Sequence, residues 1–135
     1  MAPPLEAWLG VWQLDPATLR YEHGRPGRRA LYTIERADAG LTFHLDADDP
    51  DGKLLKFTYG GPLDGVGRDI GGGARLVLTQ VDERTIDSAL ERDGRIVDHW
   101  RRALAPDGTS ITFTQSGTTP DGRPFKNVSV YYRRP

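Results

Sequence analysis

The sequence contains no cysteine, which excludes a disulfide, a thiolate nucleophile and any zinc or iron–sulfur site built on cysteine. It also has no apolar run near the ~20 residues that a transmembrane helix needs, so we expect no membrane span. The opening Met1-Ala2-Pro3-Pro4 has neither the basic nor the apolar region of a secretory signal. Provided that no leader was removed ahead of Met1, these absences predict a cytoplasmic protein.

A strong charge of either sign is missing as well. The formal net charge is -1, and acidic and basic residues are interspersed along the chain. Such a balance gives no electrostatic footprint for nucleic acid or for an anionic membrane surface. A small molecule is therefore the expected partner, and nucleic acid is not.

Motifs for metals, cofactors and common nucleophiles are also lacking. The glycine-rich residues 60–73 contain no Gly-Lys-Ser/Thr for phosphate, and no Gly-x-Ser-x-Gly elbow occurs. Residues 46–52 resemble the start of a calcium loop, but Pro50 stands at a ligand position and no glutamate closes the loop. The three histidines are scattered. We expect neither a metal nor a cofactor.

What the sequence does contain is a regular series of short alternating segments. Its 135 residues fit one domain, 1–135, that buries roughly two thirds of its unfolded surface. Turn dipeptides such as Asp51-Gly52 and Asp93-Gly94 separate segments in which apolar residues recur at every second position. The expected strands are 11–15, 29–36, 41–46, 54–59, 74–82, 85–92, 95–104, 109–116 and 123–133.

The two ends of this series predict how the sheet is completed. Residues 3–9 fit one or two turns of helix, because Leu5, Trp8 and Leu9 share a helical face, and such a helix would cap a barrel mouth. Residues 16–28 are expected to be a long loop that acts as a lid or portal, and 60–73 a flexible rim. The prediction is an all-β, up-and-down antiparallel β-barrel of about nine or ten strands with a short N-terminal helical cap. A two-sheet sandwich is the alternative.

Several stretches resemble the calycin superfamily of lipocalins and fatty-acid-binding proteins, in its small bacterial lipocalin-like branch. They are residues 10–16 (GVWQLDP), 91–97 (ERDGRIV), 105–109 (APDGT) and 116–131 (SGTTPDGRPFKNVSVY). The resemblance implies an up-and-down barrel with an internal cavity for an apolar or amphipathic small molecule. It also implies that Trp12 packs against an arginine of the last strand, either Arg133 or Arg134. The residues assigned to barrel closure are Gly10, Trp12 and Arg133.

Residues 95–104 can present either of two faces to the interior. If the face of Trp100 lies inward, Asp98 and Arg102 also enter the cavity and form a candidate site for a ligand carboxylate or phenolate. If the other face lies inward, His99 and Arg101 enter, and His99 becomes a candidate general base. Alternatively, the strand is simply a charged surface that Trp100 anchors to the core.

Aromatic and amide side chains in the expected strands are candidates for lining the cavity, where hydroxyl and amide groups would orient a ligand. The predicted ligand-binding residues are Tyr32, Phe43, Phe57, Tyr59, Trp100, Phe113, Gln115 and Tyr131. Tyrosines also line barrels for purely structural reasons and satisfy their hydroxyls at the barrel ends.

Three functions follow from this pattern. The first is a non-enzymatic, lipocalin-like protein that binds a small hydrophobic or amphipathic molecule. The second is a small-molecule enzyme of the cyclase or isomerase type in the same cavity, with His99, Asp98, Tyr59 and Tyr32 as candidate catalytic residues. The third is a protein-interaction barrel without a cavity, for which a homodimer would be the expected form.

Overall fold

The computed structural model describes residues 4–134, so Pro3, the first residue of the expected N-terminal helix, lies outside the described residues. Within them the chain forms ten β-strands and one turn of 3-10 helix. The turn is η1 (Glu6–Trp8), and the strands are β1 (Gly10–Tyr21), β2 (Ala30–Ala37), β3 (Gly40–Asp48), β4 (Leu54–Pro62), β5 (Arg68–Gly71), β6 (Ala74–Asp82), β7 (Thr85–Arg92), β8 (Arg95–Leu104), β9 (Ser110–Thr118) and β10 (Pro124–Arg133).

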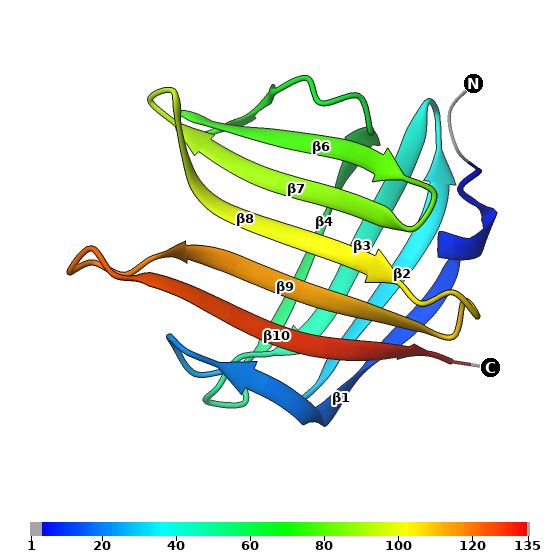
Figure 1. Cartoon of the computed structure of the whole chain (residues 1–135), viewed down its shortest axis with the longest axis horizontal. Coiled ribbons are helices and arrows are strands. Elements are labelled where there is room, and N and C mark those ends of the chain that lie inside the picture. Colours follow the sequence, from blue (N-terminus) through cyan, green and yellow to red (C-terminus); the bar gives the residue numbers. More distant parts are fainter. Residues whose placement is uncertain (1–3, 135) are drawn as a thin grey trace.

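All ten strands belong to one antiparallel sheet in the order β4-β3-β2-β1-β10-β9-β8-β7-β6-β5. Neighbours in the sheet are neighbours in the chain except where β1 pairs with β10, which joins the two ends of the sequence. The sheet curls on itself so that β2, β3 and β4 cross behind β6 to β10 at a steep angle (Figure 1). The predicted all-β, up-and-down architecture is confirmed.

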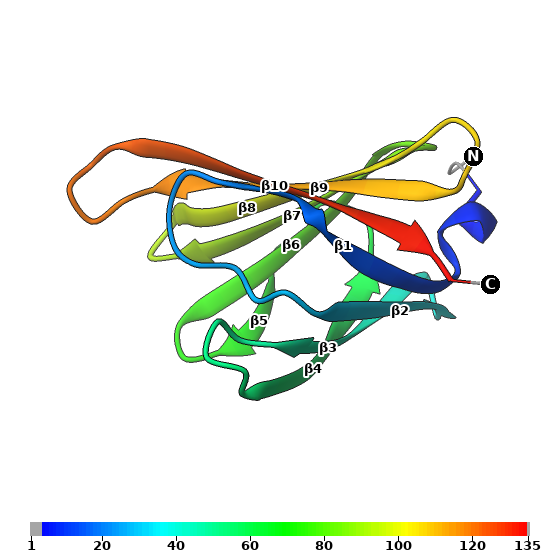
Figure 2. The same cartoon turned by 90° about the horizontal axis from the view of Figure 1, so that it is seen from below.

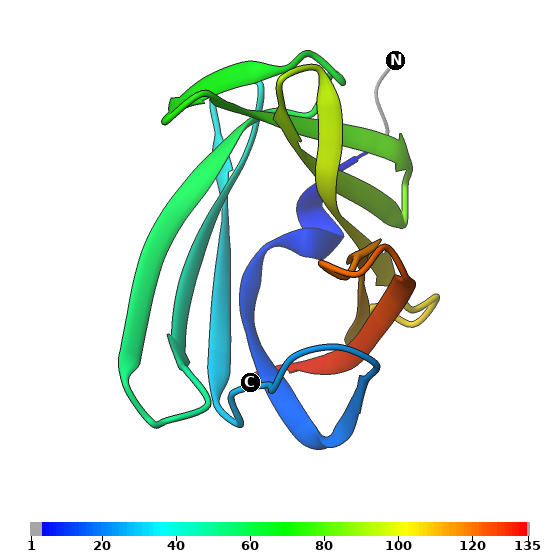
Figure 3. The same ribbon diagram turned by 90° about the vertical axis from the view of Figure 1, so that its left-hand side faces the viewer.

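The expected full closure of the barrel is wrong. Strands β4 and β5 lie at opposite ends of the sheet order and are not paired with each other in the described part of the chain. The connection between them instead approaches β6, through a bridge between Asp64 and Thr79 and a 2.8 Å hydrogen bond from the Gly65 amide to the Leu78 carbonyl. The curled sheet seen end-on in Figure 3 therefore keeps an open seam beside β4.

The N-terminal helical cap is reduced to the single turn η1. Leu5 precedes this turn without a side-chain cap, and Leu9 is already extended. A stable helix needs several consecutive turns to offset its nucleation cost, and Gly10 stops this one at its first. The 3₁₀ turn nevertheless buries Trp8 completely.

Two segments expected to be loops contain strand. β1 continues to Tyr21 past Pro16, because an irregularity between Asp15 and Arg20 removes the proline from the ladder with β10. Residues 60–73, expected to be a flexible rim, contribute the last residues of β4 and all of β5. Glycine-rich backbone can pair with a neighbouring strand without apolar side chains, so the composition of residues 60–73 gave no indication of these strands.

The closed end of the curl is built on two tryptophans. Trp8 and Trp12 are both fully buried, and the Trp12 indole N–H donates to the Trp8 carbonyl at 3.0 Å. The Arg133 guanidinium lies 4.2 Å from the centre of the Trp12 ring. Gly10 has a φ of 128°, and a Cβ there would approach Arg133 Nη1 to 2.9 Å. This end of the molecule is therefore packed solid, and the space for a ligand lies at the other.

Candidate functional site

The interior of the curl holds a cavity of about 640 Å³. Its lining comes from every strand of the sheet, and it combines apolar residues such as Leu19, Leu45, Phe57 and Ile70 with the charged Arg29 and Asp48. The predicted ligand-binding residues that line it are Tyr32, Phe57, Tyr59, Trp100, Phe113, Gln115 and Tyr131. Phe43 is fully buried and lies behind the lining, stacked on Tyr59 with ring centres 5.1 Å apart.

The mouth of the cavity is crossed by residues 22–29, which loop from the end of β1 to β2 (Figure 2). Asn127 of β10, which is only 4% exposed, holds the start of this segment. Its side-chain oxygen accepts from the Glu22 amide at 2.8 Å and from the His23 amide at 3.2 Å, and its amide nitrogen donates to the His23 carbonyl at 3.0 Å. The expected lid is thus shorter than predicted and is fixed to a cavity-lining residue.

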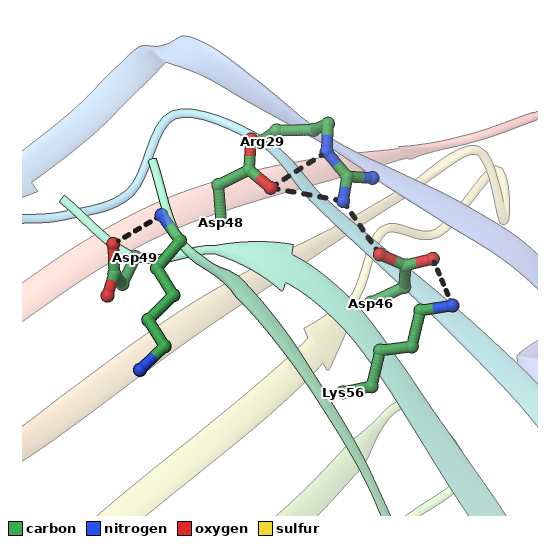
Figure 4. A network of polar contacts seen from close by, with 6 residues as sticks. Arg29, Asp46, Asp48, Asp49 and Lys56 are labelled. Atoms are coloured by element: carbon green, nitrogen blue, oxygen red, sulfur yellow. Dashed lines mark hydrogen bonds and ion pairs between the residues drawn. The ribbon is translucent and has the colours of Figure 1, made fainter. Parts of the chain in front are cut away.

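A charged network fixes the other end of this segment. The Arg29 guanidinium donates to the carboxylates of Asp46 at 2.7 Å and Asp48 at 3.2 Å, and Lys56 Nζ lies 4.0 Å from Asp46 (Figure 4). The hydrogen bond from Arg29 lowers the pKa of Asp46. Close by, Gly27 approaches the Asp48 carbonyl so tightly that a Cβ would lie 1.8 Å from its oxygen. Both ends of the segment are therefore anchored to strands.

The structure decides which face of β8 lies inward. Trp100 lines the cavity and Arg102 is 2% exposed, so the face that also carries Asp98 is the inner one. His99 lies on the outer face, where its Nε2 is 3.6 Å from Asp87 and its Nδ1 is 3.4 Å from Ser116. His99 is thus kept apart from Tyr59 and Tyr32, with which the enzyme hypothesis grouped it.

Arg102 is buried between aromatic rings directly behind the cavity lining, where it contacts the lining residues Ser88 and Tyr59. Its guanidinium carbon lies 4.5 Å from the centre of Phe43 and 5.0 Å from that of Phe113. Nη1 donates to the Ser88 hydroxyl at 2.6 Å, and Nη2 donates to the hydroxyl of Tyr59. Stacking between rings and hydrogen bonds to two strands fix the position of this cation.

Hydroxyl groups extend the donor array beyond Arg102. The Tyr59 hydroxyl points toward that of Tyr32 across a long 3.4 Å contact. Burial raises the pKa of Tyr32 well above its ordinary value, with the neighbouring Tyr59 contributing in the same direction. The Tyr32 hydroxyl therefore keeps its proton. The Tyr59 hydroxyl accepts from Arg102 and donates to Tyr32, so the hydroxyl hydrogens that remain for a ligand are those of Ser88 and Tyr32.

No carboxylate neutralises Arg102 among residues 4–134, since the ion pairs that these residues form do not include it. A buried charge without a partner is costly, and the neutral hydroxyls of Ser88 and Tyr59 compensate only part of the loss of water. An anionic group entering the cavity would find a positioned cation with hydroxyl donors around it.

The sequence analysis named Arg102 as part of a candidate anion site only for one of the two possible orientations of residues 95–104, and the predicted ligand-binding residues did not include Ser88. The signal for Arg102 was its position two residues after Trp100 on the same strand face. The strand 124–133 carried a similar signal, because Asn127 and Ser129 alternate with Tyr131 and line the cavity with it. Ser88 gave no comparable signal, since its contact with Arg102 depends on the register between β7 and β8.

Comparisons with known proteins bear on the fold. No protein-family model matches the chain, and no curated protein matches it. Among solved structures it is similar to a redesigned beta barrel, with 18% sequence identity, a TM-score of 0.55, and coverage of 100% of this chain and 98% of that one. At this identity the likeness supports the β-barrel architecture alone. No helix within residues 4–134 is long and apolar enough to cross a membrane.

Proposed function

We propose that this protein binds a small amphipathic molecule in its cavity, with an anionic group of the ligand on Arg102 and the apolar part toward the mouth. This is the lipocalin-like binding role that the sequence predicts. The observation that carries it is the buried Arg102 guanidinium, which has no carboxylate partner in the described chain and touches the cavity through its hydrogen bonds to the lining residues Ser88 and Tyr59.

The distribution of polarity supports this orientation of the ligand. The lining residues Ser88 and Tyr32 offer donors close to Arg102, whereas Leu19, Leu45 and Phe57 give the cavity apolar surface. A carboxylate accepts hydrogen bonds at both oxygens and suits such a cluster of donors. A volume of about 640 Å³ lies within the usual range for pockets that hold small molecules.

Calorimetric titration with decanoic acid and with decanol tests the proposal, because the two probes share an apolar chain and differ in the charged group. We expect decanoate to bind the wild-type protein at least about tenfold more tightly, since a charge-assisted hydrogen bond contributes roughly 1.5–3 kcal/mol. The variant Arg102→Met keeps apolar bulk between the rings and should lose this preference.

Thermal unfolding of Arg102→Met checks that the variant is folded before its binding is compared. If it does not fold, Ser88→Ala serves instead, since it removes one hydroxyl beside Arg102 and should weaken decanoate binding with little effect on decanol. Equal affinity of the wild-type protein for the two probes, or no saturable binding of decanoate, would contradict the proposal.

A further inference from the structure

A second charged group lies on the inner face of β8. Asp98 precedes Arg102 by four residues, so strand alternation places both on the face of Trp100. The Asp98 carboxylate accepts a hydrogen bond of 3.1 Å from the side-chain amide of Gln115, which lines the cavity. Asp98 is half-buried, whereas Arg102 is fully buried, so the two charges lie at different depths.

Asp98, like Arg102, takes part in none of the ion pairs formed by residues 4–134. The side chains around it on neighbouring strands are uncharged. Leu90 of β7 is its register partner, Gln115 of β9 is its hydrogen-bond donor, and Gly117 of β9 lies close beside its Oδ1. The inner wall thus carries an unpaired cation at depth and an unpaired carboxylate nearer the mouth.

The spacing of these charges indicates the length of a matching ligand. Four residues of strand separate the Cα atoms of Asp98 and Arg102 by roughly 13 Å, at about 3.3 Å per residue. The Arg102 guanidinium reaches back to Ser88, the register partner of Trp100, so the two charges lie closer together than the two Cα atoms. Trp100 lies between them and lines the cavity with its large apolar side chain. A molecule that satisfied both charges would be elongated, with opposite charges at its ends and an apolar chain between.

We propose that the ligand is bipolar, with an anionic group bound at Arg102 and a cationic ammonium bound at Asp98. This inference rests on the proposed function, because it specifies the second end of the same ligand. Asp98 then selects among anionic amphiphiles and favours those that carry a positive charge at the far end. Gln115 holds the Asp98 carboxylate in place by its hydrogen bond.

Titration with 10-aminodecanoic acid and decanoic acid at pH 7 tests this selection. The amino acid carries opposite charges at the two ends of a flexible chain that can bend to the spacing of Arg102 and Asp98, and decanoic acid lacks only the amine. We expect the wild-type protein to bind 10-aminodecanoic acid about fivefold more tightly, the upper range for a partly exposed ion pair. Asp98→Asn should reduce the ratio of the two affinities to about one, since asparagine keeps an oxygen for Gln115 and loses the charge.

The matched control is Asp93→Asn, which removes one negative charge from the exposed turn of the same hairpin. Asp93 has a φ of 52°, a conformation that asparagine tolerates, so this variant should keep the fivefold preference. Equal binding of both probes to the wild-type protein, or a preference that persists in Asp98→Asn, would overturn the bipolar ligand while leaving the proposed function intact. Binding of decanoic acid alone would overturn only the bipolar ligand, whereas failure of both probes to bind would overturn both proposals.

Discussion

Two arginines of this protein are stacked on aromatic rings and have different roles. Arg133 lies over Trp12 and directs its donors to backbone carbonyls, with Nη1 on Leu9 at 2.6 Å, Nη2 on Ala7 at 2.5 Å and Nε on Gly108 at 3.2 Å. A backbone carbonyl only accepts hydrogen bonds, so the donors of Arg133 are used to hold the fold together. Arg102 donates to the hydroxyls of Ser88 and Tyr59, which line the cavity, and it is the cation to which the proposed function assigns the anionic group of the ligand.

This difference leads to a prediction for Arg133. The variant Arg133→Met keeps an apolar side chain on Trp12 but removes the hydrogen bonds to three separate segments. We expect the free energy of unfolding to fall by about 2 kcal/mol, the size of hydrogen bonds to a charged donor. Urea denaturation measures the loss. Arg134→Met, at the exposed neighbouring position, should change stability little, and an equal loss in the two variants would argue against a specific role for Arg133.

At the scale of elements, β10 connects the ligand cavity to the segment that crosses its mouth. Asn127 lines the cavity and bonds to Gln115 at 3.2 Å while also holding the backbone of Glu22 and His23. The His23 ring makes a second contact with β10, because its centre lies 5.0 Å from that of the Phe125 ring. Opening of the mouth at this end of the segment therefore requires the release of groups on β10.

Asn127→Ala should free this segment without removing the strand. Loss of the side-chain oxygen leaves two backbone amides without an acceptor, and each such bond contributes about 1 kcal/mol. Hydrogen exchange of the Glu22 and His23 amides should accelerate about tenfold or more, as mass spectrometry of the peptide would show. Asn127→Asp keeps the acceptor and should remain close to wild type. Unchanged exchange in Asn127→Ala would show that other contacts hold the segment.

At the scale of the whole molecule, polar pairs cover the outside and hydroxyls are buried within. On the outer face, Arg101 donates to both carboxylate oxygens of Asp87 at 2.7 and 2.8 Å, and these hydrogen bonds lower the pKa of Asp87. Inside, burial raises the pKa of Tyr32 and of Tyr131. Stability therefore depends on pH at both extremes, for opposite reasons.

The sign of each dependence follows from the folded and unfolded pKa values. A carboxyl whose pKa is lowered by folding stabilises the protein above its unfolded pKa and loses that contribution as the pH falls, so stability should decline below about pH 4. When folding raises the pKa of a phenol, the unfolded chain releases that proton more readily, so the folded protein loses stability above about pH 10. Urea denaturation across the pH range should give a plateau between these limits.

Single variants test the acid side and the alkaline side of this dependence of stability on pH separately. Asp87→Asn should make the acid limb shallower, because the unfolded state then gains one proton fewer on acidification. Tyr32→Phe should make the loss of stability at alkaline pH less steep, because the unfolded state then releases one proton fewer as the pH rises. If the stability of Asp87→Asn declined with acid as steeply as that of the wild-type protein, the stabilising role assigned to the Asp87 carboxylate would be contradicted.

Local patterns in the sequence were enough to predict the antiparallel hairpins. The turn at Asp93-Gly94 has positive φ at both residues, 52° and 75°, as the dipeptide led us to expect. Alternation across 41–46 and 85–92 correctly indicated strands, since a strand repeats its faces every two residues whatever its partners. The lengths of β1 and β4 were underestimated, because a bulge and a run of glycines continue a strand without an apolar pattern.

The sequence by itself determined nine of the ten described strands, the turns between most of them and the candidate aromatic lining, because each depends on residues close together in the chain. Only the tertiary structure decided that Arg102 faces inward, since both faces of β8 mix apolar and charged residues and give no preference. It also brought Tyr59 of β4 to Arg102 and left β4 without a partner on one side. Such outcomes depend on how the whole sheet curls, which is a sum of contacts between distant strands and is not set by any local pattern.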